Sequence, residues 1–166
     1  YIPKEVDQDL SFSYTFQGFY VFNCTGNGME LTGGGDSTLY NFGVSKCNGV
    51  GIQLTDTIQC SILSFTVDNN VSHGIEFVSG NEDNGMVMGI IATNGGDGVK
   101  YTATSGRNII NGIQIRDNGD NGVNVADATC DNNIIISNIF SGNGSGAVAD
   151  SGTGTLVRSN IGQIDN

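Results

Sequence analysis

Tryptophan is absent from the 166-residue sequence, proline occurs once, and positive charge is scarce. Only six Lys or Arg residues stand against 17 Asp or Glu residues, which gives a net charge of -11. Without clustered cations the chain has no basic groove for a phosphate backbone and no basic patch for an anionic membrane. No apolar run reaches the roughly 18–20 residues that cross a bilayer. The sequence therefore predicts neither nucleic acid nor a membrane span.

Glycine, by contrast, is heavily used, with 26 residues. It shows no period of three, which excludes a collagen-like chain. Val, Ile, Leu and Phe recur regularly, and so much apolar surface indicates a folded core rather than disorder. The length suits one domain.

The apolar residues belong to a repeat of 23–24 residues. Six segments read glycine, apolar, variable, apolar, and they begin at Gly28, Gly51, Gly74, Gly98, Gly122 and Gly146. Alternation with period two indicates strands that bury one face. The repeat predicts an all-β, single-stranded right-handed parallel β-helix of about six to seven coils over residues 16–166, with residues 1–15 as an edge or cap fragment. Equivalent residues would stack about 4.8 Å apart.

Three more apolar columns precede each glycine. Twelve residues before it stand Phe16, Leu39, Ile62, Met86, Ile110 and Ile134. Nine before it stand Phe19, Phe42, Phe65, Gly89, Ile113 and Ser137, and the three phenylalanines are expected to stack in the core. Seven before it stand Val21, Val44, Val67, Ile91, Ile115 and Ile139.

A polar column four residues before each glycine predicts a turn, because asparagine tolerates left-handed backbone and binds neighbouring amides. Its members are Cys24, Cys47, Asn70, Asn94, Asn118 and Gly142. Cys24 and Cys47 would lie within disulfide range. Two stacked free thiols are the favoured interpretation.

These repeats resemble the pectate-lyase-like superfamily of parallel β-helices, whose coils read Asn…Gly-apolar-x-apolar over Phe16 to Gly162 here. The coil around His73-Gly74-Ile75-Glu76-Phe77 is similar to coils of mannuronan epimerases, and NosD-like periplasmic proteins share the same pattern. The resemblance implies the fold and a link to polysaccharides. Viral tailspikes and surface adhesins are built from such coils as well.

The sequence departs from the catalytic motifs of this superfamily. The epimerases carry Asp-Pro-His about two coils before the His-Gly coil, where this chain reads Gly28-Met29-Glu30-Leu31. No Asp cluster paired with an Arg matches the calcium site of pectate lyases. Only His73 is carried over as a candidate catalytic residue.

Five side chains form the candidate catalytic site. The column two residues after each glycine points outward and reads Glu30, Gln53, Glu76, Lys100, Asn124 and Val148. The column just before the glycine reads Asn27, Val50, His73, Asp97, Asn121 and Ser145. His73 would then lie beside Asp97 and near Glu76, so that an Asp-oriented imidazole with Glu76, Lys100 and Glu30 could abstract a proton next to a uronate carboxyl or act as a glycosidic acid.

A solvated polar ladder, with Glu76 and Lys100 paired across strands, is the competing interpretation of these columns. No cofactor is predicted. Acidic loop residues leave a calcium site open, although a solvated acidic edge is favoured; they are Asp36, Asp56, Glu82, Asp83, Asp127, Asp131 and Asp150.

Two functions follow as hypotheses. The first is an extracellular, cell-surface or virion-borne carbohydrate-interacting module that processes a polysaccharide or surface glycan as a lyase, hydrolase or epimerase. The second is a non-catalytic shaft or adhesin of a virion tail fibre or surface filament. The last residues form no obvious cap, and uncapped coils favour homo-oligomers or end-to-end assembly.

Overall fold

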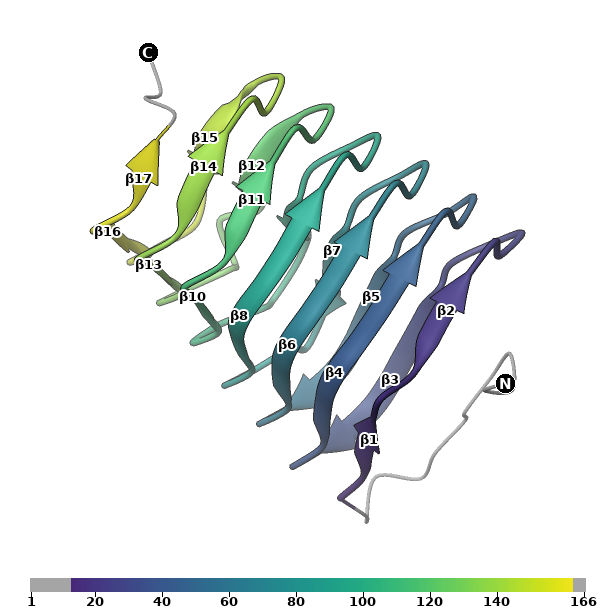
Figure 1. Cartoon of the computed structure of the whole chain (residues 1–166). Helices are drawn as coiled ribbons and strands as arrows, with labels where there is room; N and C mark the ends of the chain where they lie inside the picture. The colour runs from purple at the N-terminus through teal and green to yellow at the C-terminus, as the bar shows by residue number, and fades with distance from the viewer. Residues whose placement is uncertain (1–12, 163–166) are drawn as a thin grey trace.

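The computed structural model describes residues 13–162, so most of the expected edge fragment lies outside the described residues. Within them the chain winds into a right-handed parallel β-helix of about six turns without helices, as the repeat predicted. Figure 1 shows the coils stacked in chain order from the purple to the yellow end. None of the described residues forms a helix that could cross a membrane.

Two parallel sheets make up the solenoid. The six-stranded sheet contains β3 (Met29–Gly35), β5 (Ile52–Ile58), β7 (Ile75–Ser79), β9 (Val99–Tyr101), β12 (Asn121–Val125) and β15 (Gly146–Asp150). The 11-stranded sheet contains β1 (Thr15–Gln17), β2 (Tyr20–Phe22), β4 (Thr38–Ser45), β6 (Ser61–Asp68), β8 (Gly85–Ala92), β10 (Ile109–Asn111), β11 (Gln114–Arg116), β13 (Ile134–Ile136), β14 (Ile139–Ser141), β16 (Leu156–Arg158) and β17 (Ile161–Gly162). In Figure 1, β4, β6 and β8 lie side by side across the front.

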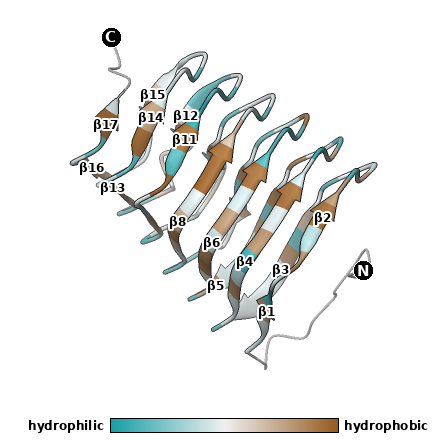
Figure 2. Cartoon of the chain, in the orientation of Figure 1, coloured by the Kyte–Doolittle hydropathy of each residue, from teal (hydrophilic) through white to brown (hydrophobic). Residues whose placement is uncertain are grey.

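The apolar columns meet inside the solenoid. Phe19 and Phe42 stack with ring centroids 4.9 Å apart, and Phe42 and Phe65 follow at 5.8 Å, which confirms the predicted stack. Phe77 and Tyr101 add a second stack at 4.5 Å. Figure 2 shows apolar segments recurring at corresponding places of β2, β4, β6 and β8. The aligned rows let each coil bury the apolar edge of the next.

The repeated glycine is required by the close approach of neighbouring coils. A Cβ on Gly51 would lie 2.6 Å from the carbonyl oxygen of Gly74, and a Cβ on Gly74 would meet Gly98 in the same way. Any larger residue would push the coils apart. Ala147 takes the equivalent place in β15, the last strand of this sheet.

Asparagines form hydrogen-bonded ladders at the turns. Asn70, Asn94, Asn118 and Asn143 form one, in which the amide nitrogen of Asn94, for example, donates to Oδ1 of Asn118 at 3.0 Å. Further ladders, which the sequence did not predict, run through Asn84, Asn108 and Asn133 and through Asn138 and Asn160. These side chains satisfy buried backbone groups that the turns would otherwise leave unpaired.

Cys24 and Cys47 stand two residues after the paired Phe22 and Ser45, and both are free thiols, as favoured. Burial raises the pKa of the Cys47 thiol to about 11. The thiol therefore stays protonated at neutral pH and packs as a small apolar side chain.

The predicted register is wrong by one residue in the last coil. Ile110 pairs with Ile135 and Ile115 with Phe140, steps of 25 residues (135 - 110 and 140 - 115) where 24 were expected. The extra residue lies in the turn after β12, where Asp127 accepts hydrogen bonds from the backbone nitrogen and hydroxyl of Thr129. The predicted members Ile134, Ser137, Ile139, Gly142, Ser145, Gly146 and Val148 are replaced by Ile135, Asn138, Phe140, Asn143, Gly146, Ala147 and Ala149.

Candidate functional site

The outward side chains of the six-stranded sheet form a polar surface that we call the side face. It consists of two neighbouring columns. One contains Asn27, Val50, His73, Asp97 and Asn121, of which Val50 is apolar and buried. The other contains Glu30, Gln53, Glu76, Lys100 and Asn124. The strands place these residues because glycine and the inward apolar residues fix which positions point outward. The structure therefore brings His73, Glu76, Asp97 and Lys100 together, with Glu76 on β7, Lys100 on β9, and His73 and Asp97 in the turns just before these two strands.

The Asp97 backbone nitrogen, rather than its carboxylate, makes the hydrogen bond that orients His73. This nitrogen donates to Nδ1 of His73 at 2.9 Å, while the nearest carboxylate oxygen of Asp97 lies 3.5 Å from the same atom. A backbone N–H is always a donor, so Nδ1 must carry a lone pair. The proton of the neutral imidazole therefore sits on Nε2, which faces Lys100.

The Asp97 carboxylate accepts hydrogen bonds from residues of the next coil. Its side chain is 3% exposed, and it accepts hydrogen bonds from the backbone and side-chain nitrogens of Asn121 and from the side chain of Asn124, at 3.0 to 3.1 Å. Both oxygens are thereby satisfied, which allows a charge to be buried. Asp97 positions the coils and is not exposed to a substrate.

Lys100 and Glu76 are register neighbours, yet they form no ion pair within residues 13–162. Glu76 Oε2 instead accepts a hydrogen bond from Gln53 Nε2 at 3.0 Å, and Lys100 Nζ lies 3.2 Å from Nε2 of His73. The cross-strand pairing of the competing interpretation is therefore not made. Lys100 differs in this from Arg107 and Arg116, whose guanidinium groups bind neighbouring carboxylates.

Two hydrogen-bond donors consequently converge on one point of the side face. Nε2–H of His73 and the ammonium of Lys100 cannot bond to each other while both keep their protons. An oxygen anion accepting from both would relieve this conflict. Burial, followed by the positive charge of Lys100, lowers the pKa of His73. His73 is therefore neutral at physiological pH and acts as a donor through Nε2.

Glu30 lies at the start of the same surface. Its Oε1 accepts a hydrogen bond from Asn27 Nδ2 at 2.8 Å, and Asn27 also reaches Gln53 at 3.3 Å. Gln53 continues this chain to Glu76. Glu30 thus belongs to the side face, separated from Lys100 by the strands that carry Gln53 and Glu76.

No group of three or more His, Cys, Asp or Glu side chains suited to a metal ion exists among residues 13–162.

The single histidine allows a direct test of its protonation. Nitrogen-15 NMR should show a protonated Nε2 and an unprotonated Nδ1, with a titration midpoint below 6.5. Because the folded pKa is lower than the unfolded one, the stability that neutral His73 contributes is present above pH 6.5 and lost as the pH falls through the folded pKa.

Lys100→Met is the matched variant for this experiment. It removes one cause of the lowered pKa and should raise the midpoint while the proton stays on Nε2. A proton found on Nδ1 in either protein would contradict the assignment.

Comparison with known proteins identifies the fold of the chain but assigns it to no family. No protein-family model matches the chain, and no curated protein matches it. Among solved structures, the periplasmic alginate epimerase AlgG is similar with a TM-score of 0.78 and 15% identity over 90% of this chain and 42% of the epimerase. The chain therefore shares the parallel β-helix fold of this epimerase.

Two lyases have a similar fold. An alginate lyase from Paenibacillus sp. str. FPU-7 gives a TM-score of 0.73 at 16% identity, covering 88% of this chain and 65% of the lyase. Pectate lyase Pel9A gives 0.60 at 13% identity, covering 88% and 55%. The predicted resemblance to pectate-lyase-like β-helices is thereby confirmed. The chain spans less than half the length of the epimerase and under two thirds of each lyase.

Proposed function

We propose that this chain is a carbohydrate-processing β-helix module whose side face takes a uronate-containing polysaccharide. The observation that supports this proposal most directly is that Lys100 Nζ and His73 Nε2 lie 3.2 Å apart. No carboxylate of the described chain lies between them. A sugar carboxylate accepts from both donors and restores the pairing that Glu76 does not provide. The likeness to an alginate epimerase and to alginate and pectate lyases supports this substrate class.

Glu76 is the proposed proton-transfer group. It lies beside Lys100 in the register, is half-buried, and has one oxygen held by Gln53. His73 is excluded as a base while Nδ1 accepts the Asp97 amide, so it serves as a donor to the substrate carboxylate. Glu76 is the carboxyl group nearest to the Lys100 position along that column.

Only one uronate fits this arrangement well. The rest of the side face carries Glu30 and the amides Asn27, Gln53, Asn121 and Asn124, which suit sugar hydroxyls better than further carboxylates. We therefore expect a polysaccharide in which uronates alternate with neutral sugars to bind more tightly than a pure polyuronate. We further propose that the module works outside the cytoplasm, in line with its likeness to a periplasmic epimerase.

Incubation with alginate, pectate and an alternating uronate–neutral heteropolysaccharide tests the proposal. Binding, release of unsaturated or reducing ends, and C5 inversion by NMR are the measurements. Lys100→Met should weaken binding about tenfold to a hundredfold, since a charge-assisted hydrogen bond is lost. Glu76→Gln should abolish turnover with binding retained.

Lys46→Met is the matched control, because Lys46 is exposed, lies outside the side face and forms no ion pair in the described part of the chain. Equal losses in Lys46→Met and Lys100→Met would refute the carboxylate subsite. Filaments in electron micrographs from a protein that binds none of the polysaccharides would favour the shaft instead.

A further inference from the structure

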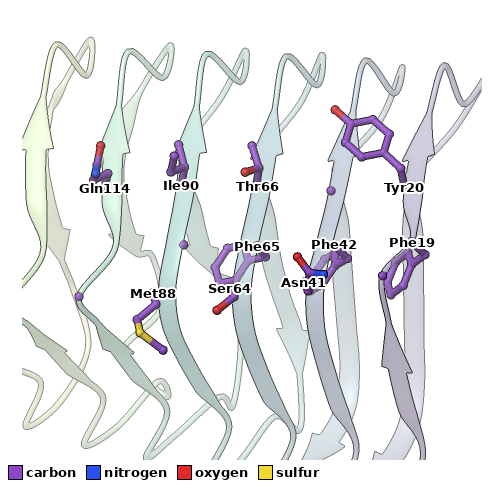
Figure 3. A pocket seen from close by; sticks show the side chains of 14 residues that line it. Phe19, Tyr20, Asn41, Phe42, Ser64, Phe65, Thr66, Met88, Ile90 and Gln114 are labelled. Atoms are coloured by element: carbon purple, nitrogen blue, oxygen red, sulfur yellow. The ribbon is translucent and has the colours of Figure 1, made fainter.

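A groove of about 720 Å³ runs along the outer surface of the 11-stranded sheet, away from the side face (Figure 3). We call it the bend groove. It crosses five successive coils and is lined by Gly18, Phe19, Tyr20, Asn41, Phe42, Gly43, Ser64, Phe65, Thr66, Met88, Gly89, Ile90, Gly112 and Gln114. Its length follows the stacking direction, because equivalent residues of neighbouring coils line it.

A ladder of left-handed residues creates this groove. Gly18, Asn41, Ser64, Met88 and Gly112 have φ angles of 66°, 54°, 51°, 56° and 66°. Asn41, Ser64 and Met88 bend β4, β6 and β8, while Gly18 separates β1 from β2 and Gly112 separates β10 from β11. The bends of the five coils therefore align into one continuous fold line. Glycine and asparagine adopt this conformation readily, whereas serine and methionine rarely do. The left-handed bend is thus present in each of these five coils, including those in which serine or methionine makes this conformation unfavourable.

Tyr20 provides an aromatic surface at one end of the groove. Its side chain is 60% exposed and lies across Gly43 of the next coil, where a Cβ would overlap the ring. Figure 3 shows the ring reaching from β2 towards β4. Phe22 lies beside it with a centroid distance of 6.0 Å. One ring face rests on the sheet, which leaves the other for a planar apolar partner.

Four polar side chains of the groove are unused within the described chain. Asn41, Ser64, Thr66 and Gln114 make no side-chain hydrogen bonds to residues 13–162. The amides of the side face, in contrast, are hydrogen-bonded: Asn27 donates to Gln53, and Gln53 and Asn121 donate to the carboxylates of Glu76 and Asp97. None of the 14 lining residues is charged, although the chain as a whole carries -11. The groove therefore offers donors, acceptors and an aromatic face without an electrostatic preference for ions.

We infer that the bend groove binds a segment of an uncharged linear polysaccharide lying along the solenoid axis. One sugar ring stacks on Tyr20, and hydroxyls of the following sugars bond to Asn41, Ser64, Thr66 and Gln114. The coil spacing of about 4.8 Å is close to the length of one pyranose unit in an extended chain, so successive coils meet successive sugars. This site is separate from the proposed uronate site and takes a chemically different ligand.

Titration with cellohexaose, xylohexaose, mannohexaose and hexamannuronate tests the inference. The chain has no tryptophan, so tyrosine fluorescence and NMR report binding. At least one neutral hexasaccharide should bind, and Tyr20→Ala should weaken it about tenfold through loss of stacking. Thr66→Asp, which places a charge on an outward strand position in the groove, should weaken it as well.

Val71→Ala is the control, because Val71 is 65% exposed and lies outside the groove. Lys100→Met should also leave neutral binding unchanged, which separates this site from the uronate subsite. The inference is overturned if no neutral hexasaccharide binds, if the Lys100→Met variant, which lacks the uronate subsite, binds hexamannuronate as well as a neutral hexasaccharide, or if binding survives both groove variants. A dimer in sedimentation that Tyr20→Ala dissociates would overturn it too, by assigning the groove to a second copy of the chain.

Discussion

Replacing Asn108 with alanine is expected to lower the free energy of unfolding by about 3–5 kcal/mol. Oδ1 of Asn108 accepts hydrogen bonds from the backbone and side-chain nitrogens of Asn84, both at 3.0 Å. Its Nδ2 donates to the backbone oxygen of Asn81 at 3.0 Å and to Asn133 at 3.2 Å. The alanine variant loses all four, and the buried backbone nitrogen of Asn84 is left without a partner.

Urea unfolding followed by circular dichroism measures this effect. Asn111→Ala is the matched control, since Asn111 lies three residues further on and its side chain makes no hydrogen bond within residues 13–162. The control should change stability by less than about 0.5 kcal/mol. Similar losses in both variants would show that the ladder does not contribute the expected stability.

Phe140→Ala is expected to destabilise the chain by about 3–5 kcal/mol, whereas Ile139→Ala should cost less than about 1 kcal/mol. Phe140 is 1% exposed and pairs with Ile115, and a Cβ on Gly122 would lie 2.5 Å from its ring. Ile139 is 48% exposed on the outer surface. The large side chain in the core therefore belongs to position 140.

The same two variants decide the register of the last coil. A regular step of 24 residues would bury Ile139 and expose Phe140, and the order of the two losses would then be reversed. The measurement is again the free energy of unfolding from urea titrations. Ile139→Ala as the more damaging change would refute the 25-residue coil.

The one-residue shift could not be read from the sequence for a physical reason. Ile134, Ile135 and Ile136 are identical, and Ile139 and Phe140 are both apolar, so either register satisfies the alternation. Gly146 coincidentally continues the glycine spacing. What decides the register is the turn after β12, whose Asp127–Thr129 hydrogen bonds accommodate the extra residue.

The first five coils were predictable because the glycine and the apolar residues before and after it recur together at steps of 23 or 24 residues. The same spacing was enough to predict that His73, Glu76, Asp97 and Lys100 share one surface. The spacing could not show which partner each side chain selects, because that depends on side-chain conformation. Lys100 approaches Nε2 of His73, while Glu76 accepts a hydrogen bond from Gln53 instead. The bend groove was missed entirely, since glycine, asparagine, serine and methionine at its fold line share no sequence pattern.

Four ladder asparagines, Asn84, Asn94, Asn118 and Asn143, are followed directly by glycine. Such Asn-Gly pairs normally deamidate fast, because the backbone nitrogen of the glycine attacks the side-chain amide of the asparagine, which is then converted to aspartate. Here each attacking nitrogen is engaged: Gly95 donates to Asn70 at 2.9 Å and Gly119 to Asn94 at 2.8 Å, and the other two are bonded likewise. The solenoid therefore shields its own weakest covalent linkages. Each excursion to the unfolded state exposes them, and an aspartate formed there can no longer donate to the next rung, so the working lifetime of the molecule depends on how rarely its coils open.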